Sequence, residues 1–212
     1  MIKVLFLIFE PNVAWEKIAQ ARRGFVFITL IHLLPLILAG TALEAWGLSL
    51  HGKWQPKFRF YKTFSAQEIV NFETIQFFLL FAVVVASAVL IYKISQTFQD
   101  RLTFLQAYTT AAYGFSPLFL FHFLDASADI HPAVPWLIGM ALAMWIFYQG
   151  IPRVMQPDPT HAFGVYLSAI FVVVLTSGLA RIITGMYLLG YIDLQHSWLS
   201  HKIAGIMRLF GH

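Results

Sequence analysis

The chain of 212 residues contains no cysteine and few charged residues. Without cysteine it has no disulfide, no thiolate zinc site, no iron–sulfur cluster and no cysteine nucleophile. Only 11% of its residues are Asp, Glu, Lys or Arg, whereas soluble domains carry about 25%. So little charge cannot cover the surface of a globule in water, and the composition therefore excludes an ordinary soluble domain.

The sequence also lacks the motifs of enzymes that act within membranes. It has no Gly-x-Ser-x-Gly nucleophile and no His-Glu-x-x-His helix, and its aspartates lie outside the apolar blocks or at their ends. Its net charge of +4 comes from basic residues beside those blocks, where anionic headgroups lie, and not from a nucleic-acid-binding run. We therefore expect no enzymatic activity, no cofactor and no nucleic-acid partner.

Apolar residues are abundant, at 59% of the chain, and they fall in long blocks. A helix of about 20 residues crosses the hydrocarbon layer of a bilayer. The blocks predict five spans, at residues 25–43, 75–92, 105–124, 134–151 and 162–180. Residues 182–192, after Arg181, are too few for a sixth crossing, so they extend the fifth helix or form an interfacial turn. The predicted fold is all-α, a polytopic membrane protein with a five-helix transmembrane bundle.

Interfacial amphipathic helices are expected at both ends of this bundle. A helix begins at Pro11, and Trp15 is placed to anchor it in the headgroup plane, although a soluble extension is the alternative. The tail has an apolar helical stripe formed by Leu199, Ile203, Ile206 and Phe210. No repeat or linker divides the chain. We count a single domain, 1–212, made of a lead-in (1–24), the bundle (25–192) and the amphipathic tail (193–212).

Local signals also predict features of the first span and of the loop that follows it. Pro35 is expected to kink the first span, a fault that neighbouring helices can repair. Polar and aromatic residues alternate from Lys57 to Lys62, which indicates a short strand or a surface-seeking loop. Ser65 and Glu68 have the capping-box spacing, so a helix should begin there.

Basic residues favour the cytoplasmic side of a membrane. With five crossings, seven Lys and Arg residues lie on the side of the N-terminus and six on the other, with Arg181 unassigned. The basic cluster before the first span favours a cytoplasmic N-terminus.

Two segments resemble a known family. The lead-in Glu10-Pro11-Asn12-Val13-Ala14-Trp15-Glu16 and the third-span motif Tyr113-Gly114-Phe115-Ser116-Pro117 are similar to the Yip (Ypt/Rab-interacting protein) membrane domain, in particular to its bacterial branch. The resemblance extends from Pro11 to about Leu189. The long polar N-terminal domain of eukaryotic members, with its acidic Tyr-Gly-Pro motif, is missing, so the resemblance does not extend to Rab binding.

The resemblance implies a non-enzymatic scaffold or adaptor that organises a membrane or a partner complex. It also implies a multi-pass protein of the bacterial inner (cytoplasmic) membrane. The expected partners are membrane lipids together with a protein partner or a second copy of the chain.

The third span carries the largest group of polar residues within a span, namely Tyr108, Thr109, Thr110, Tyr113 and Ser116, followed by Pro117. Small polar residues of membrane helices commonly form hydrogen bonds between helices. Alternatively they line a polar groove, to which Pro117 adds a backbone carbonyl freed of its donor. The second interpretation predicts a lipid or small-solute transporter.

Ionisable residues within the spans or at their ends are further candidates. Arg181 either extends to the headgroups or forms a buried pair, for which Glu44 is the natural partner. His32, in the first span, is expected to form a hydrogen bond between helices.

Histidine and aspartate gather after the third span, at His122, Asp125, Asp129 and His131. His122 and Asp125, three residues apart, share a helical face, and the group has ligand types that suit a divalent metal. The alternative is that these residues cap helices and solvate the loop.

Overall fold

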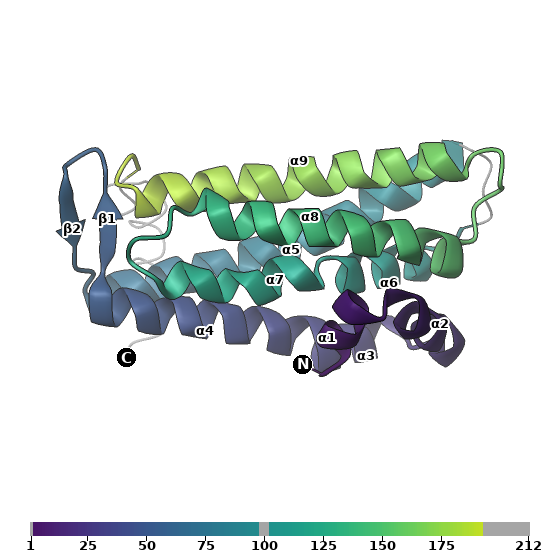
Figure 1. Cartoon of the computed structure of the whole chain (residues 1–212), viewed down its shortest axis with the longest axis horizontal. Helices are drawn as coiled ribbons and strands as arrows, with labels where there is room; N and C mark the ends of the chain where they lie inside the picture. Colours follow the sequence, from purple (N-terminus) through teal and green to yellow (C-terminus); the bar gives the residue numbers. More distant parts are fainter. Residues whose placement is uncertain (1, 98–101, 193–212) are drawn as a thin grey trace, which may run out of the picture.

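The computed structural model describes residues 2–97 and 102–192, and these form an elongated helical bundle with a small hairpin at one end (Figure 1). The α-helices, in chain order, are α1 (Ile2–Phe9), α2 (Pro11–Ala21), α3 (Phe25–Ile28), α4 (Leu34–His51), α5 (Ala66–Thr97), α6 (Phe104–Gly114), α7 (Ser116–Phe121), α8 (Ala133–Gly150) and α9 (Ala162–Leu188). Two π-helical turns, η1 (Thr29–Leu33) and η3 (Ile151–Met155), and one 3₁₀ turn, η2 (His122–Ala126), continue them. The predicted tail helix lies outside the described residues.

Four helices are long and apolar enough to cross a membrane: Phe25–His51, Ala66–Thr97, Ala133–Met155 and Ala162–Leu188. They match the first, second, fourth and fifth predicted spans, but each is longer than expected. Arg181 lies inside α9, which runs on without a break to Leu188. Residues 182–188 therefore extend the fifth helix, as one of the two alternatives predicted.

The third predicted span is divided. It consists of α6, then α7, then η2, and it runs between the two ends of the bundle (Figure 1). Phe115 separates the two α-helices, and Pro117 at the start of α7 has no N–H with which to continue the bonding of α6. None of the three pieces has the length of a spanning helix. The count of five spans therefore stays a prediction.

The first long helix contains a π-helical turn immediately before Pro35. In this turn the N–H of Leu34 donates to the carbonyl of Thr29, five residues back. Proline disturbs the regular helical ladder, and π-helical turns are one way in which a helix accommodates such a disturbance. The helix is therefore continuous from Phe25 to His51, with its irregularity one turn earlier than Pro35 itself.

A hairpin lies in the middle of the predicted first loop, and α4 and α5 extend into its two ends. Strands β1 (Lys53–Gln55) and β2 (Phe60–Lys62) are antiparallel, with Lys53 opposite Lys62. The strand interpretation was therefore right for the end of the alternating segment. The predicted capping box is confirmed, because the N–H of Ser65 donates to Glu68 Oε2 at 2.8 Å and the N–H of Glu68 donates to Ser65 Oγ at 3.3 Å.

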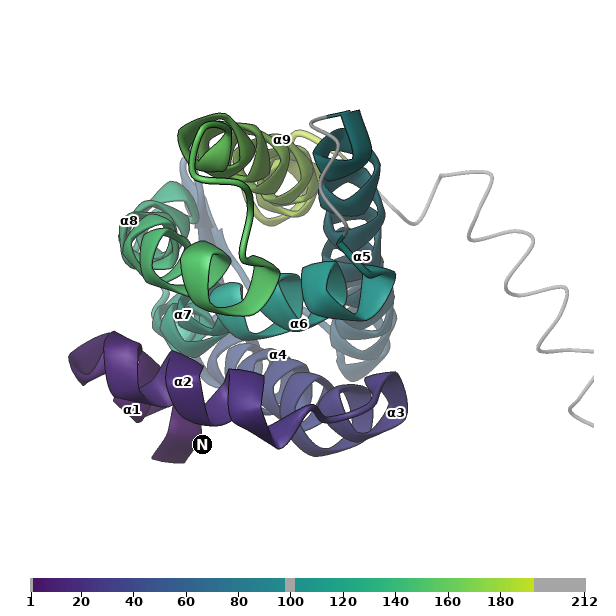
Figure 2. The same ribbon diagram turned by 90° about the vertical axis from the view of Figure 1, so that its right-hand side faces the viewer.

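The lead-in packs against the bundle, with α2 lying on α8 and η3 (Figure 2). Trp15 is fully buried, and its indole N–H donates to the carbonyl of Ile146 at 3.0 Å. The prediction that Trp15 anchors the helix in the headgroups is therefore wrong. Gly150 makes this burial possible, because a Cβ there would lie 2.4 Å from the indole ring.

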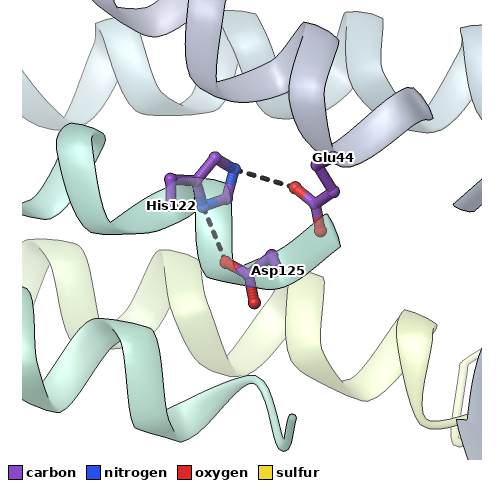
Figure 3. A group of neighbouring side chains, drawn as sticks. All are labelled: Glu44, His122 and Asp125. Atoms are coloured by element: carbon purple, nitrogen blue, oxygen red, sulfur yellow. Dashed lines mark ion pairs between the residues drawn. The ribbon is translucent and has the colours of Figure 1, made fainter. Parts of the chain in front are cut away.

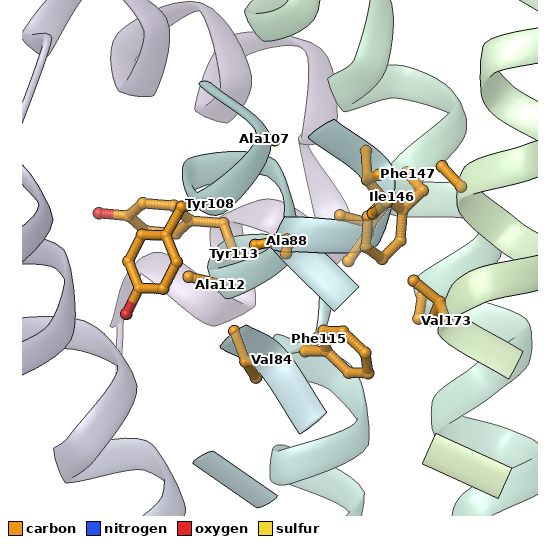
Figure 4. Close-up of a cluster of buried hydrophobic side chains, with 14 of the residues drawn as sticks. Val84, Ala88, Ala107, Tyr108, Ala112, Tyr113, Phe115, Ile146, Phe147 and Val173 are labelled. Carbon is orange, nitrogen blue, oxygen red and sulfur yellow. The ribbon is translucent and has the colours of Figure 1, made fainter. Parts of the chain in front are cut away.

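The core combines small residues with large aromatic ones where α6 lies between α5 and α8 (Figure 4). Ala88, Ala107 and Ala112 are fully buried and let the helix backbones approach closely. A Cβ at Gly114 would lie 2.5 Å from the ring of Phe147, so this ring packs directly on the backbone of α6. Such close packing stabilises helix association in a bilayer, where the hydrophobic effect does not drive helices together because the lipid tails are equally apolar.

We predict that Gly150→Ala destabilises the protein by about 1–3 kcal/mol, because the added methyl group overpacks the Trp15 pocket. The matched control is Gly178→Ala, whose Cβ would meet Trp136 at an ordinary 3.5 Å. Both substitutions raise helix propensity equally. Denaturant unfolding in detergent measures the difference, and equal stability of the two variants would show that Trp15 is not tightly held.

Candidate functional site

The polar side chains of the third helical segment mostly contact the first long helix. Tyr108 Oη lies 2.6 Å from Thr29 Oγ1, and Ser116 Oγ lies 2.9 Å from His32 Nε2. The ring of Tyr113 stacks on the imidazole of His32 with centroids 4.0 Å apart. These are contacts between helices, of the kind expected for small polar residues in a membrane.

The remaining members of this group are also engaged. The hydroxyls of Thr109 and Thr110 donate to backbone carbonyls one turn earlier, at 2.7 and 2.9 Å. Pro117 is buried, and its carbonyl would lie 3.3 Å from a Cβ at Gly139. Thr109 and Thr110 therefore bond within their own helical segment, whereas Tyr108 and Ser116 join it to the first long helix.

A second polar group, the buried charge cluster, lies toward the hairpin end of the bundle. Its centre is His122, whose Nε2 lies 2.8 Å from Glu44 Oε2 and whose Nδ1 lies 2.8 Å from Asp125 Oδ2 (Figure 3). Glu44 is 0% exposed and Asp125 is 1% exposed. Charges so deeply buried are tolerated only when they are paired.

Arg181 of α9 completes the ion pairs of this cluster. Its guanidinium forms a salt bridge with Asp125 through Nη2, and its Nε donates to the carbonyl of Pro132 at 2.6 Å. Arg181 therefore points into the protein and not toward headgroups. It also does not pair directly with Glu44, because His122 and Asp125 of η2 lie between α4 and α9 (Figure 3).

Helix α5 adds two residues that the sequence analysis missed. Gln76 Nε2 donates to Glu44 Oε2, lies 2.9 Å from His122 Nε2, and lies 3.5 Å from Glu73 Oε2. Glu73 was overlooked because the second span was predicted from residue 75, whereas α5 begins at Ala66. Gln76 lies within the predicted span and was not singled out there. A glutamate and a glutamine three residues apart within one helix share a face, and this was the available signal.

Lys53 of β1 was also missed, since it lies in the predicted loop between the first two spans. It is 1% exposed, and its Nζ donates to the carbonyls of Asp125 at 3.2 Å and Ser127 at 2.7 Å. Burial lowers the pKa of the Lys53 amine, while the nearby carboxylates of Asp125 and Glu44 act in the opposite direction. Lys53 thereby fastens the hairpin onto η2.

The four predicted metal candidates are not brought together. Asp129 accepts a hydrogen bond from the hydroxyl of Tyr61 at 2.6 Å, and His131 Nδ1 accepts from the N–H of Ala133 at 3.2 Å. His122 and Asp125 belong instead to the buried charge cluster. With Glu44 they have ligand atoms that lie within 4.8 Å of one another, a spacing that suits a metal ion.

A small cavity of about 40 Å³ adjoins the cluster. Its polar lining residues include Gln76, His122, Asp125 and Arg181, and Phe115 is among the apolar ones. A water molecule needs roughly 10–15 Å³ of such space, so the cavity has room for a few. The buried charge cluster therefore adjoins a cavity that is large enough for water molecules.

Comparison with protein families decides what kind of protein this is. A family model for the Yip1 domain matches residues 5–182. The chain belongs to the Yip1 domain family. Proteins of this family are membrane trafficking proteins and are generally non-enzymatic. Comparisons with curated proteins and with solved structures gave no significant match.

The match includes every residue of the buried charge cluster and most of the four long apolar helices. This Yip1 domain protein is therefore a multi-pass membrane protein, as the sequence resemblance implied.

We predict that Arg181→Gln destabilises the Yip1 domain by about 3–5 kcal/mol, because the buried Asp125 loses its guanidinium partner and keeps only its contact with His122. Lys57→Gln, which removes an exposed cation at the same end, should have no measurable effect. Adding Asp125→Asn to Arg181→Gln should recover part of the loss. Thermal unfolding in detergent tests this, and additive losses in the double variant would contradict the pairing.

Proposed function

We propose that this protein is a non-enzymatic membrane scaffold or adaptor that organises a membrane or a partner complex. The observation that carries the proposal is that the interior polar groups form bonds between helices. Tyr108 and Ser116 bond to the first long helix, and Arg181 and Asp125 join α9 to η2. A bundle fastened in this way supports binding on its outer surface better than passage through its middle.

The hairpin is the outer surface best suited to recognition. Phe58, Phe60 and Tyr61 are 52%, 48% and 51% exposed, beside the exposed cations of Lys57 and Arg59. Aromatic residues and arginine are enriched in protein interfaces, and aromatic residues with lysine also suit anionic headgroups. Gln55 donates to the carbonyl of Leu188 at 3.3 Å, which together with Lys53 holds this surface on the bundle.

We place the protein in the bacterial inner membrane, with its N-terminus in the cytoplasm. The similarity of the lead-in to bacterial family members supports the membrane, and the basic residues before Phe25 support the orientation. The proposed partners are membrane lipids together with a protein partner or a second copy of the chain.

Site-specific photo-crosslinking in native membranes tests the scaffold proposal. A photoreactive residue at Phe58 should give a discrete protein adduct, identified by mass spectrometry as one partner or as a second copy. Phe171 is the matched control, because it is 68% exposed on the apolar face of α9 and should label lipid. The proposal fails if Phe58 labels lipid alone and the protein is a monomer in every mild detergent.

The alternative is a lipid or small-solute transporter, and the cavity beside the buried charge cluster is the observation that favours it. Liposome flux of the parent protein, compared with Tyr113→Phe and Ser116→Ala, tests this alternative. A transporter should lose flux in at least one variant, because both substitutions remove polar atoms of the third segment. Absence of flux in the parent protein would eliminate this function.

A further inference from the structure

We propose that Glu44, Glu73 and His122 bind a divalent transition metal ion, with Asp125 as the residue that orients the imidazole. These four residues come from α4, α5 and η2. Metal binding by these residues does not depend on the proposed scaffold function, so either proposal can fail without the other.

The site is marked by a point that lies among one polar atom of each proposed ligand. Gln76 Nε2 lies at that point, 2.9 Å from His122 Nε2, 3.5 Å from Glu73 Oε2, and in hydrogen-bond contact with Glu44 Oε2. A primary amide has two N–H donors and no positive charge. Its two N–H groups cannot serve two carboxylates and an unprotonated imidazole nitrogen together. They suffice only when His122 Nε2 carries a proton and donates to Glu44, 2.8 Å away, whereas a cation at the same point contacts all three groups with the imidazole neutral.

Unpartnered oxygens around this point support the assignment. Glu44 Oε1, Glu73 Oε1 and Gln76 Oε1 are buried and receive no hydrogen bond from the described residues. Glu44 and Gln76 are 0% and 1% exposed, so these atoms are out of reach of bulk water. Leaving such oxygens unpaired is costly, and a metal ion is one partner that can take several at once. Rotation of the Gln76 amide would add its own oxygen as a ligand.

The surroundings of His122 have the arrangement found behind metal-bound histidines. Its Nδ1 lies 2.8 Å from Asp125 Oδ2, which leaves Nε2 to face Glu44. A carboxylate on one ring nitrogen fixes the tautomer and raises the basicity of the other. Arg181 in turn holds Asp125. Binding a metal at Nε2 releases the proton from that nitrogen and leaves the Nδ1–H donating to Asp125.

The ligand set indicates the class of metal. One imidazole with two carboxylates suits Zn²⁺, Mn²⁺, Fe²⁺ or Co²⁺, whereas Mg²⁺ and Ca²⁺ prefer oxygen ligands alone. The adjoining cavity borders Gln76 and His122 and has room for a water ligand. The structure thus provides three protein ligands and space to complete the coordination.

Cobalt titration of the full-length protein tests the proposal, after purification in detergent and treatment with chelator. Co²⁺ should bind in a 1:1 ratio and give visible d–d absorption, and excess Zn²⁺ should abolish this absorption. Glu44→Gln and Glu73→Gln remove a charged ligand with little change in shape and should abolish or strongly weaken binding. Asp125→Asn should weaken it by about 10–100-fold, the usual effect of losing an orienting carboxylate.

Asp129→Asn is the matched control, because Asp129 is an exposed acidic residue outside the cluster and should leave the titration unchanged. The melting temperature provides a second measurement that needs no variant, since a ligand that binds the folded state raises it. Zn²⁺ should therefore raise the melting temperature of the parent protein. No cobalt absorption with no thermal shift, or equal binding by the parent and both glutamate variants, would overturn the proposal.

Discussion

The chain of charged contacts through His122 and Asp125 is the constraint on which the arrangement of the long helices depends. Glu44, Asp125 and Arg181 are too costly to bury singly in an apolar bundle, so each must meet its partner. Their contacts fix the level at which α4, η2 and α9 lie against one another. Lys53 extends the same network to the hairpin, so the outer recognition surface is tied to the interior.

The opposite end of the bundle is held by packing. Trp15 of α2 fills the space left by Gly150, and its single polar atom is satisfied by the carbonyl of Ile146. The lead-in is thus part of the fold. The end that contains Trp15 is therefore stabilised by close packing, and the hairpin end by ion pairs. The broken third segment lies between these two ends. The bonds of Tyr108 and Ser116 to the first long helix connect the two ends.

Much of the fold could be predicted because membrane helices leave a direct record in sequence. A spanning helix needs a long apolar run, so four long helices were found at nearly their correct places, and the Ser65 capping box marked the start of α5. Boundaries were less accurate. Apolar content ends where the hydrocarbon layer ends, but helical hydrogen bonding continues beyond it, and for this reason α5 includes Glu73, which precedes the predicted span.

The site was only partly predictable. The sequence alone determined that this is a helical membrane protein and that His122 and Asp125 share a helical face. It left open whether Arg181 extends to the headgroups or forms a buried pair. Which groups pair was decided by tertiary structure: Arg181 meets Asp125, and Glu44 meets His122. Gln76 and Lys53 join them from the second predicted span and from the loop before it. Helix periodicity fixes neighbours three or four residues apart, whereas contacts between helices depend on their relative level and rotation, which the packing of the whole bundle sets.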